Sequence, residues 1–231
     1  MGYELMQNLT ETGYLVLFGV AIFVIGTWMI GRYKTSQLRN RIAQNIASRF
    51  PSTTSKVSVR LLGNTGAKFS YHQKSDSLLP KLEATILLLD RSNIFHFAYC
   101  MVKRRTDQLQ IRANSRSPAS FNLELISNQE RKDLEKSLKA DSNKIHELNI
   151  ENLTEPFYIV VSNREEGETL FNENQFRKDF ETLAPYLTRL SIARKEPNLF
   201  ISVILLPEAV SAVENFVLSL PKSLRPRKKK D

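Results

Sequence analysis

A run of twenty residues without a charged side chain, residues 12–31, lies close to the start of the chain. An α-helix of that length rises about 30 Å, which matches the hydrocarbon core of a bilayer. Large aliphatic and aromatic side chains fill most of the run. Tyr14 and Trp28 lie near its two ends, where amphipathic rings favour the membrane interface. The run therefore predicts a single transmembrane helix.

The charges on either side of this run predict its orientation. Residues 1–11 contain Glu4 and Glu11 but no lysine or arginine, whereas the other flank is basic. The first cations of that flank, the juxtamembrane cations, are Arg32, Lys34, Arg39 and Arg41. The positive-inside rule places them in the cytoplasm and residues 1–11 outside. A cleaved signal peptide would instead carry its positive charge before the apolar run. We therefore expect an integral membrane protein with a cytoplasmic C-terminal domain.

Three segments are expected after the short N-terminus (1–11) and the transmembrane helix (12–31). They are a basic juxtamembrane helix and linker (32–55), a cytoplasmic domain (56–220) and a basic C-terminal tail (221–231). The juxtamembrane segment places Leu38, Ile42 and Ile46 at helical spacing. This apolar stripe either lies along lipid headgroups or packs under the domain, and the sequence leaves both open.

Residue patterns in the domain predict both strands and helices. Polar and apolar residues alternate at 56–62, and β-branched and aromatic residues fill 157–161, so both segments are expected to be strands. Further strands are expected at 67–71, 82–89, 108–113, 121–126, 190–193 and 199–206, with another candidate at 144–150. Helical spacing predicts helices at 92–102, 128–139 and 174–187, and a last one that Pro207 begins. Residues 63–66 predict a hairpin turn. In the first helix, Ser92 is the expected N-cap, and Phe95, Tyr99 and Val102 share a face. The fold class is therefore α+β, with packed helices on a mostly antiparallel sheet.

No arrangement of residues indicates catalysis. The histidines His72, His96 and His146 have no cysteine or histidine partner at metal-ligand spacing, and the single cysteine, Cys100, fits a reducing compartment. Phosphate-loop, nucleophile-elbow and zinc-protease motifs do not occur. The acidic residues within 165–168 are expected to form a solvated turn. We therefore expect no enzyme activity, metal, cofactor or small-molecule substrate.

Positive charge gathers at both edges of the predicted domain. The net charge is +9, and no acidic residue occurs between Glu11 and Asp76. A second basic block consists of Arg225, Arg227, Lys228, Lys229 and Lys230. Such cations attract anionic lipid when they lie beside a bilayer, or bind RNA phosphates with a steep salt dependence. A solvated tail would need no partner. The juxtamembrane cations and the tail are therefore candidate contacts for headgroups or ribosomal RNA.

Residues 82–115, LEATILLLDRSNIFHFAYCMVKRRTDQLQIRANS, resemble the central domain of the calumin family, the coiled-coil-domain subunit of the PAT complex. In that family an arginine begins a helix after a strand, and a D-Q-x-Q-I strand follows. The matching positions here are Arg91, Asp107, Gln108, Gln110 and Ile111. The order of the later strands and helices is also similar.

The resemblance implies a non-enzymatic factor in membrane-protein biogenesis. Its expected partners are the Sec translocon, an Asterix-like small membrane protein and the ribosome, in the endoplasmic reticulum or an archaeal plasma membrane. Two departures matter, because the family's acidic luminal region and its long C-terminal coiled coil have no counterpart here. The expectation is a membrane-anchored adaptor or chaperone for multi-pass proteins at the translocon–ribosome junction. The alternative is a lipid-bound scaffold or assembly subunit of another membrane complex.

Overall fold

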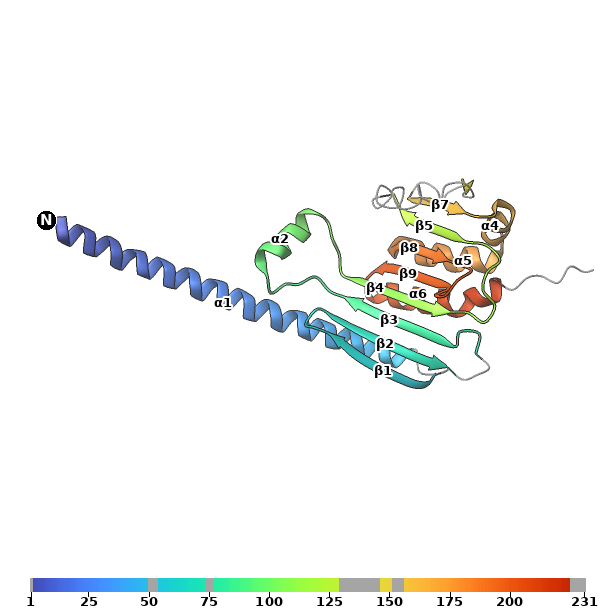
Figure 1. The fold of residues 1–231 in the computed structure, drawn as a ribbon, viewed down its shortest axis with the longest axis horizontal. Coiled ribbons are helices and arrows are strands. Elements are labelled where there is room, and N and C mark those ends of the chain that lie inside the picture. The colour runs from blue at the N-terminus through green and yellow to red at the C-terminus, as the bar shows by residue number, and fades with distance from the viewer. Residues whose placement is uncertain (1, 50–53, 74–76, 129–145, 151–155, 225–231) are drawn as a thin grey trace, which may run out of the picture.

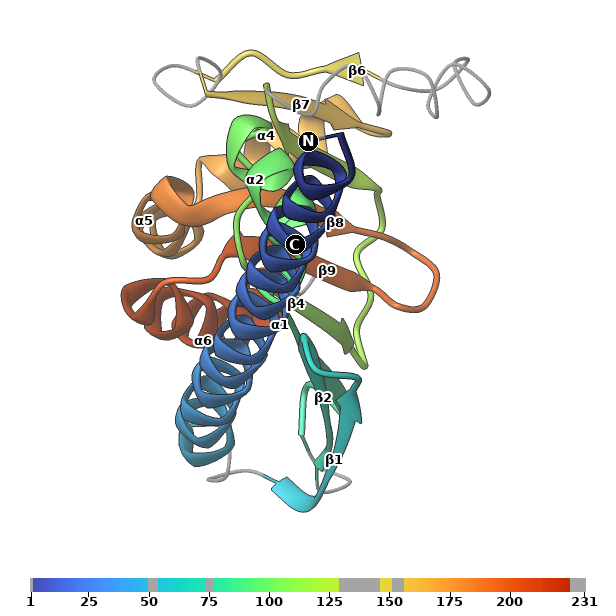
Figure 2. The same cartoon turned by 90° about the vertical axis from the view of Figure 1, so that its left-hand side faces the viewer.

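The computed structural model describes residues 2–49, 54–73, 77–128, 146–150 and 156–224 and confirms the α+β class (Figure 1). One long helix, α1 (Gly2–Arg49), leads into a nine-stranded sheet. Figure 2 shows α1, α5 and α6 on the same side of this sheet. The domain is therefore built on the C-terminal end of the helix that carries the apolar run.

The sheet has the spatial order β1-β2-β3-β4-β9-β8-β5-β7-β6, and every pair of neighbours among these described strands is antiparallel. The strands are β1 (Thr54–Leu62), β2 (Gly66–Gln73), β3 (Lys81–Leu87), β4 (Gln108–Asn114), β5 (Leu123–Ser127), β6 (His146–Glu147), β7 (Phe157–Val161), β8 (Leu187–Ile192) and β9 (Leu199–Ile204). The hairpin predicted at residues 63–66 joins β1 to β2. The mostly antiparallel sheet expected from the alternating residues is thus present.

One face of the sheet carries a continuous apolar layer. Alternate residues of each strand point to this face, so the buried Phe69 of β2 lies opposite Ala84 of β3, which lies opposite Ile111 of β4. The row continues through Ile201 of β9 and Leu190 of β8. Because these side chains are buried, they form the core against which the helices pack.

Two helices cover the C-terminal half of this layer: α5 (Asn174–Leu183) and α6 (Pro207–Ser223). They meet through Phe176 and Phe216, whose ring centroids lie 5.6 Å apart. Phe180 stacks on Phe176 at 6.0 Å and meets Phe171 of α4 (Arg164–Phe171) edge-on at 5.7 Å. Pairs of this geometry add to the burial of apolar surface, so the aromatic cluster holds the helices on the sheet.

The C-terminal end of α1 covers the layer over β2. Ile46 is fully buried and Ile42 is partly buried against the core, while the hydroxyl of Tyr71 in β2 donates a hydrogen bond to the carbonyl of Ile46 at 3.4 Å. Burial raises the pKa of this tyrosine to about 12. Of the two alternatives left open by the sequence, the apolar stripe of the juxtamembrane segment therefore packs under the domain.

Several predicted boundaries differ from the structure, for local reasons. Helix α2 spans Ile94–Val102, and Asn93 rather than Ser92 is its N-cap, because the Asn93 side chain accepts the hydrogen bond from the His96 amide. The predicted helix at 174–187 ends at Leu183, since Pro185 lies in a short 3₁₀ turn that leads into β8.

The two other differences concern the later helices. The acidic residues within 165–168, expected in a solvated turn, lie in α4. Asn163 caps the N-terminus of this helix, because its side chain accepts a hydrogen bond from the Glu166 amide. Helix α6 continues through the buried Pro221 to Ser223, past the expected start of the tail at residue 221. The helix predicted at 128–139 and the basic residues 225–230 fall almost entirely outside the described residues.

Candidate functional site

The apolar part of α1 extends away from the domain. Among the described residues, one helix is long and apolar enough to cross a membrane, and the apolar window of that helix has no buried residue. Side chains such as Leu15, Phe18 and Ile30 are all more than half exposed. An unshielded run of this kind is unfavourable in water and favourable in hydrocarbon, so α1 is a candidate membrane span.

The candidate span meets the domain at one close contact. A Cβ atom added at Gly31 would overlap the backbone carbonyl of Arg91 and would come within 2.9 Å of the Ser92 Cα. The neighbouring turn of α1 is also fixed, because the buried Thr35 hydroxyl donates to the Gly31 carbonyl at 2.8 Å. We call the end of the domain at this contact the span-proximal end.

The loop at this end is held by an ion pair between Arg91 and Asp107. Arg91 Nη2 lies 2.7 Å from Asp107 Oδ2, and both side chains are largely buried. Asp107 Oδ1 also accepts a hydrogen bond from the Leu89 amide at 2.8 Å, and the Asp107 carbonyl accepts one from the Leu205 amide. This pair therefore ties the segment before α2 to the segment after it and to the end of β9.

The structure thus brings together two of the five residues on which the family resemblance rests. Arg91 precedes α2 by three residues and does not begin it. Gln108, Gln110 and Ile111 lie in β4, where Ile111 is a fully buried core residue and Gln110 pairs with Thr85 and Ser202. These three residues stabilise the sheet and form no site.

A second set of hydrogen bonds shapes the turn before α2. The Ser92 amide and hydroxyl both donate to Asp90 Oδ1, at 2.9 and 2.5 Å. The hydrogen bond from the Ser92 hydroxyl is the main reason why the pKa of Asp90 is lowered from its ordinary value of 3.8, against the opposing effect of burial. With the Asn93 cap, this turn fixes the direction in which α2 leaves the domain.

Helix α2 directs most of its apolar side chains outward. Phe95 and Val102 are each 81% exposed, and Tyr99 is 50% exposed. Cys100 is buried, with its sulfur 3.5 Å from Nε2 of His96 one helical turn earlier, so the expectation that His96 has no cysteine partner is wrong. The stripe expected at helical spacing is therefore present, but it faces away from the core.

Three consecutive cations follow α2, and sequence reasoning overlooked them. Lys103, Arg104 and Arg105 are all exposed, and Arg104 adopts a positive φ of 52°. The guanidinium of Arg105 lies 5.8 Å from the ring centroid of Tyr99, so this cation and the apolar surface of α2 adjoin. A basic triplet directly after an apolar helix is the signal that would have located them.

The juxtamembrane cations divide between two roles. Arg32 is exposed and lies over the Trp28 ring at 5.3 Å, and Lys34 and Arg41 are exposed. Arg39 is only 8% exposed; its Nη1 donates to the Gly63 carbonyl at 2.9 Å and its Nη2 donates to the Ser36 hydroxyl. Arg39 therefore fastens the β1–β2 turn to α1, whereas the headgroup or RNA contacts expected of the juxtamembrane cations stay predictions.

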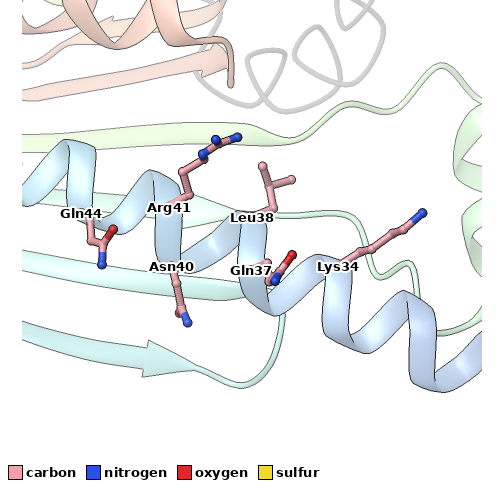
Figure 3. Close-up of a pocket in the computed structure, with 6 residues that line it drawn as sticks. All are labelled: Lys34, Gln37, Leu38, Asn40, Arg41 and Gln44. Carbon is pink, nitrogen blue, oxygen red and sulfur yellow. The ribbon is translucent and has the colours of Figure 1, made fainter.

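The exposed face of α1 lines a shallow groove of about 600 Å³. It is lined by Lys34, Gln37, Leu38, Asn40, Arg41 and Gln44. Figure 3 shows Lys34 and Arg41 extending from α1 on either side of Leu38. With two cations, three side-chain amides and one apolar residue, the groove suits an anionic or hydrogen-bonding surface.

An apolar strip lies on β1. Val57, Val59 and Leu61 are exposed, and they alternate along the strand on the face that β2 turns toward α1. Their neighbours on β2 are buried beneath α1, so β1 extends the apolar layer beyond the cover that this helix provides. We call these three residues the β1 strip. It is continuous with the core and has solvent on its outer side.

Among the residues that the structure describes, no group of three or more His, Cys, Asp or Glu side chains is placed to hold a metal ion. The expectations of no enzyme activity and no cofactor stay predictions.

Comparison with known proteins gives no family. No family model matches the chain, and no curated protein matches it. Among solved structures, the mycobacterial trehalose monomycolate transport factor A, TtfA, is similar over 80% of this chain and 82% of its own chain, with 11% sequence identity and a TM-score of 0.33. A likeness at that level carries no argument about function.

Proposed function

We propose that this protein is a membrane-anchored adaptor, without catalytic activity, that assists the biogenesis of multi-pass membrane proteins from the cytoplasmic side. The observation that carries the proposal is the continuity of α1. One uninterrupted helix includes the candidate span and, through Thr35, Arg39 and Ile46, the buried support of the sheet. A domain joined in this way is held at a defined distance from the bilayer.

The β1 strip provides the contact surface that an adaptor needs. Val57, Val59 and Leu61 are 43 to 58% exposed, and they pair with residues of β2, the strand that α1 covers. Apolar side chains gathered on an edge strand are typical of sites that bind another protein. The occupant that fits the proposal is an apolar segment of an unfinished membrane protein or of a partner subunit at the translocon.

Site-specific photocrosslinking tests this proposal. A photoreactive amino acid at Val59 should crosslink to a multi-pass membrane protein on stalled ribosomes bound to native membranes. It should not crosslink to a stalled cytosolic protein of equal length. The matched control position is Lys81, which is exposed on the opposite face of the same sheet.

The outcomes separate clearly. Adducts to the membrane protein from Val59 and none from Lys81 would support an adaptor role. Equal adducts from both positions, or none from Val59, would contradict it. Ribosome pelleting of the full chain at rising salt, with and without residues 225–230, tests separately whether the basic tail contacts RNA.

The second candidate function, a lipid-bound scaffold of another membrane complex, is favoured by the exposed cations at the span-proximal end. Arg32 and Lys34 follow Gly31 on α1, and the exposed triplet follows α2. Flotation with liposomes and pelleting with ribosomes, compared over the same salt series, distinguish the two functions. A scaffold floats with anionic liposomes and does not pellet with ribosomes.

A further inference from the structure

Helix α2 differs from α5 and α6 in what covers its apolar residues. The apolar side chains of α5 and α6 lie mainly against the sheet, whereas those of α2 lie mainly in the open. Ile94, Phe95, Tyr99, Met101 and Val102 are all exposed large hydrophobic residues, and together they make up more than half of this nine-residue helix. Such a surface is unfavourable in water, so it requires a cover.

The position of α2 relative to α1 indicates what covers this apolar surface. Figure 1 shows α2 standing apart from the sheet, beside α1 and on the side from which the N-terminal half of α1 extends. The contact between Gly31 and Arg91 lies three residues before α2 begins, and Gly31 is also the last residue of the uncharged run. The helix therefore lies at the level where the candidate span leaves the hydrocarbon.

The charges around α2 point to the same surface. Lys103, Arg104 and Arg105 directly follow the helix, and Arg32 and Lys34 lie on the facing part of α1. Aromatic and aliphatic side chains next to a group of cations are typical of segments that lie in the headgroup region, where the apolar side enters the acyl boundary and the cations meet lipid phosphates. Tyr99, with its ring beside Arg105, has the amphipathic character favoured at that depth.

We propose that α2 is a second membrane contact, which inserts Phe95, Tyr99 and Val102 into the interfacial region of the leaflet that the span leaves, with Lys103, Arg104 and Arg105 on its lipid phosphates. The proposal rests on the membrane anchorage of the proposed function. It adds that the domain is held at two points, so that its rotation about α1 is restricted.

Depth-dependent fluorescence quenching tests this insertion. The chain has a single tryptophan, Trp28, near the inner end of the apolar run. In a Trp28→Phe background, Phe95→Trp places an indole on α2, and Leu218→Trp places one on the exposed side of α6 as the matched control. Each variant and the wild type are reconstituted into phosphatidylcholine vesicles containing phosphatidylglycerol, with bromine atoms near either the headgroup end or the methyl end of the acyl chains.

The expected result is that the indole at position 95 is quenched about as strongly as Trp28, and more by the shallow bromines than by the deep ones. The indole at position 218 should keep its fluorescence. Quenching of Trp28 without quenching at position 95 would overturn the insertion of α2 and leave the anchor standing, as expected if a partner protein covers α2. No quenching of Trp28 would overturn the anchorage itself, and the proposal with it.

The role of the cations is tested in the same vesicles. Quenching at position 95 should increase with the fraction of phosphatidylglycerol and decrease with salt. The combined change Lys103→Gln, Arg104→Gln and Arg105→Gln should remove both dependences. The control change Arg194→Gln with Lys195→Gln, in the exposed loop between β8 and β9, should leave them intact. An unchanged response of the triple variant would overturn the contact between these cations and lipid.

Discussion

The backbone carbonyl of Arg91 lies so close to Gly31 that no side chain fits between them. This contact joins the candidate span to the loop before α2, and it is made by backbone atoms that cannot move aside as a flexible side chain can. Gly31→Ala should therefore lower the free energy of unfolding of the domain by about 1–3 kcal/mol, a range typical of overpacking. Denaturant titration in detergent micelles measures this change.

Gly26 is the matched control for this prediction, because a Cβ atom added there meets nothing within 4 Å. Gly26→Ala should leave the unfolding midpoint unchanged. Equal effects of the two substitutions would mean that the contact at Gly31 does not limit stability.

The ion pair between Arg91 and Asp107 should make a measurable contribution, because both side chains are mostly shielded from water. A double-mutant cycle with Arg91→Gln and Asp107→Asn isolates their coupling. Hydrogen bonds to charged groups are typically worth about 1.5–3 kcal/mol. Because both side chains keep some contact with solvent, we expect a coupling energy of about 1–2 kcal/mol in denaturant unfolding. If the stability changes of the two single substitutions simply add in the double variant, the ion pair contributes no coupling energy.

Arg39 and Arg41 are two residues apart and should respond differently to the same substitution. Arg39→Met removes a buried guanidinium that donates to the Gly63 carbonyl and to the Ser36 hydroxyl, so the domain should lose about 1–3 kcal/mol. Arg41→Met removes an exposed cation and should change stability by less than about 0.5 kcal/mol. Thermal unfolding of both variants checks this, and liposome flotation should be weakened by Arg41→Met only.

Stability toward acid should depend on Glu83. The hydrogen bond from Lys68, whose Nζ lies 2.9 Å from Glu83 Oε2, is the main reason why the pKa of this carboxyl is lowered from 4.5. A lowered folded-state pKa gives stability that is fully present above the unfolded pKa and is lost as the pH falls through the folded value. Glu83→Gln should therefore reduce stability at neutral pH and flatten the loss of stability below pH 4.5. If the stability of the variant falls with pH as steeply as that of the wild type, groups other than Glu83 cause the sensitivity to acid.

Much of the fold could be predicted from the sequence, because in several segments the local residue pattern and the tertiary structure agree. The alternation in β1 and β2 around residues 63–66 predicts the hairpin, and Pro207 begins α6 because its fixed φ and missing amide suit a first helical position. The uncharged run predicts the long apolar part of α1 from composition alone. In each of these places few alternatives satisfy the local constraints.

The span-proximal end was harder to predict, because helical spacing shows which residues share a face but not what that face meets. Phe95 and Tyr99 have the spacing of a core stripe, and only their exposure in the folded chain shows that they point outward. Arg39 and Arg41 are likewise equivalent in the sequence. The β1–β2 turn, far along the chain, makes one of them a buried donor. Such distinctions arise from contacts between distant segments, which periodicity does not encode.

Because α1 has no break between the apolar run and the sheet, a bilayer around the candidate span would set the orientation of the domain. The part of α1 beyond Gly31 is roughly 27 Å long at the rise of an α-helix. Transmembrane helices tilt by about 20° on average, and by more in thinner bilayers, and a 20° change would swing the inner end of α1 sideways by about 9 Å. A change in bilayer thickness that tilts the candidate span would therefore move the sheet, and with it the surface that the sheet exposes.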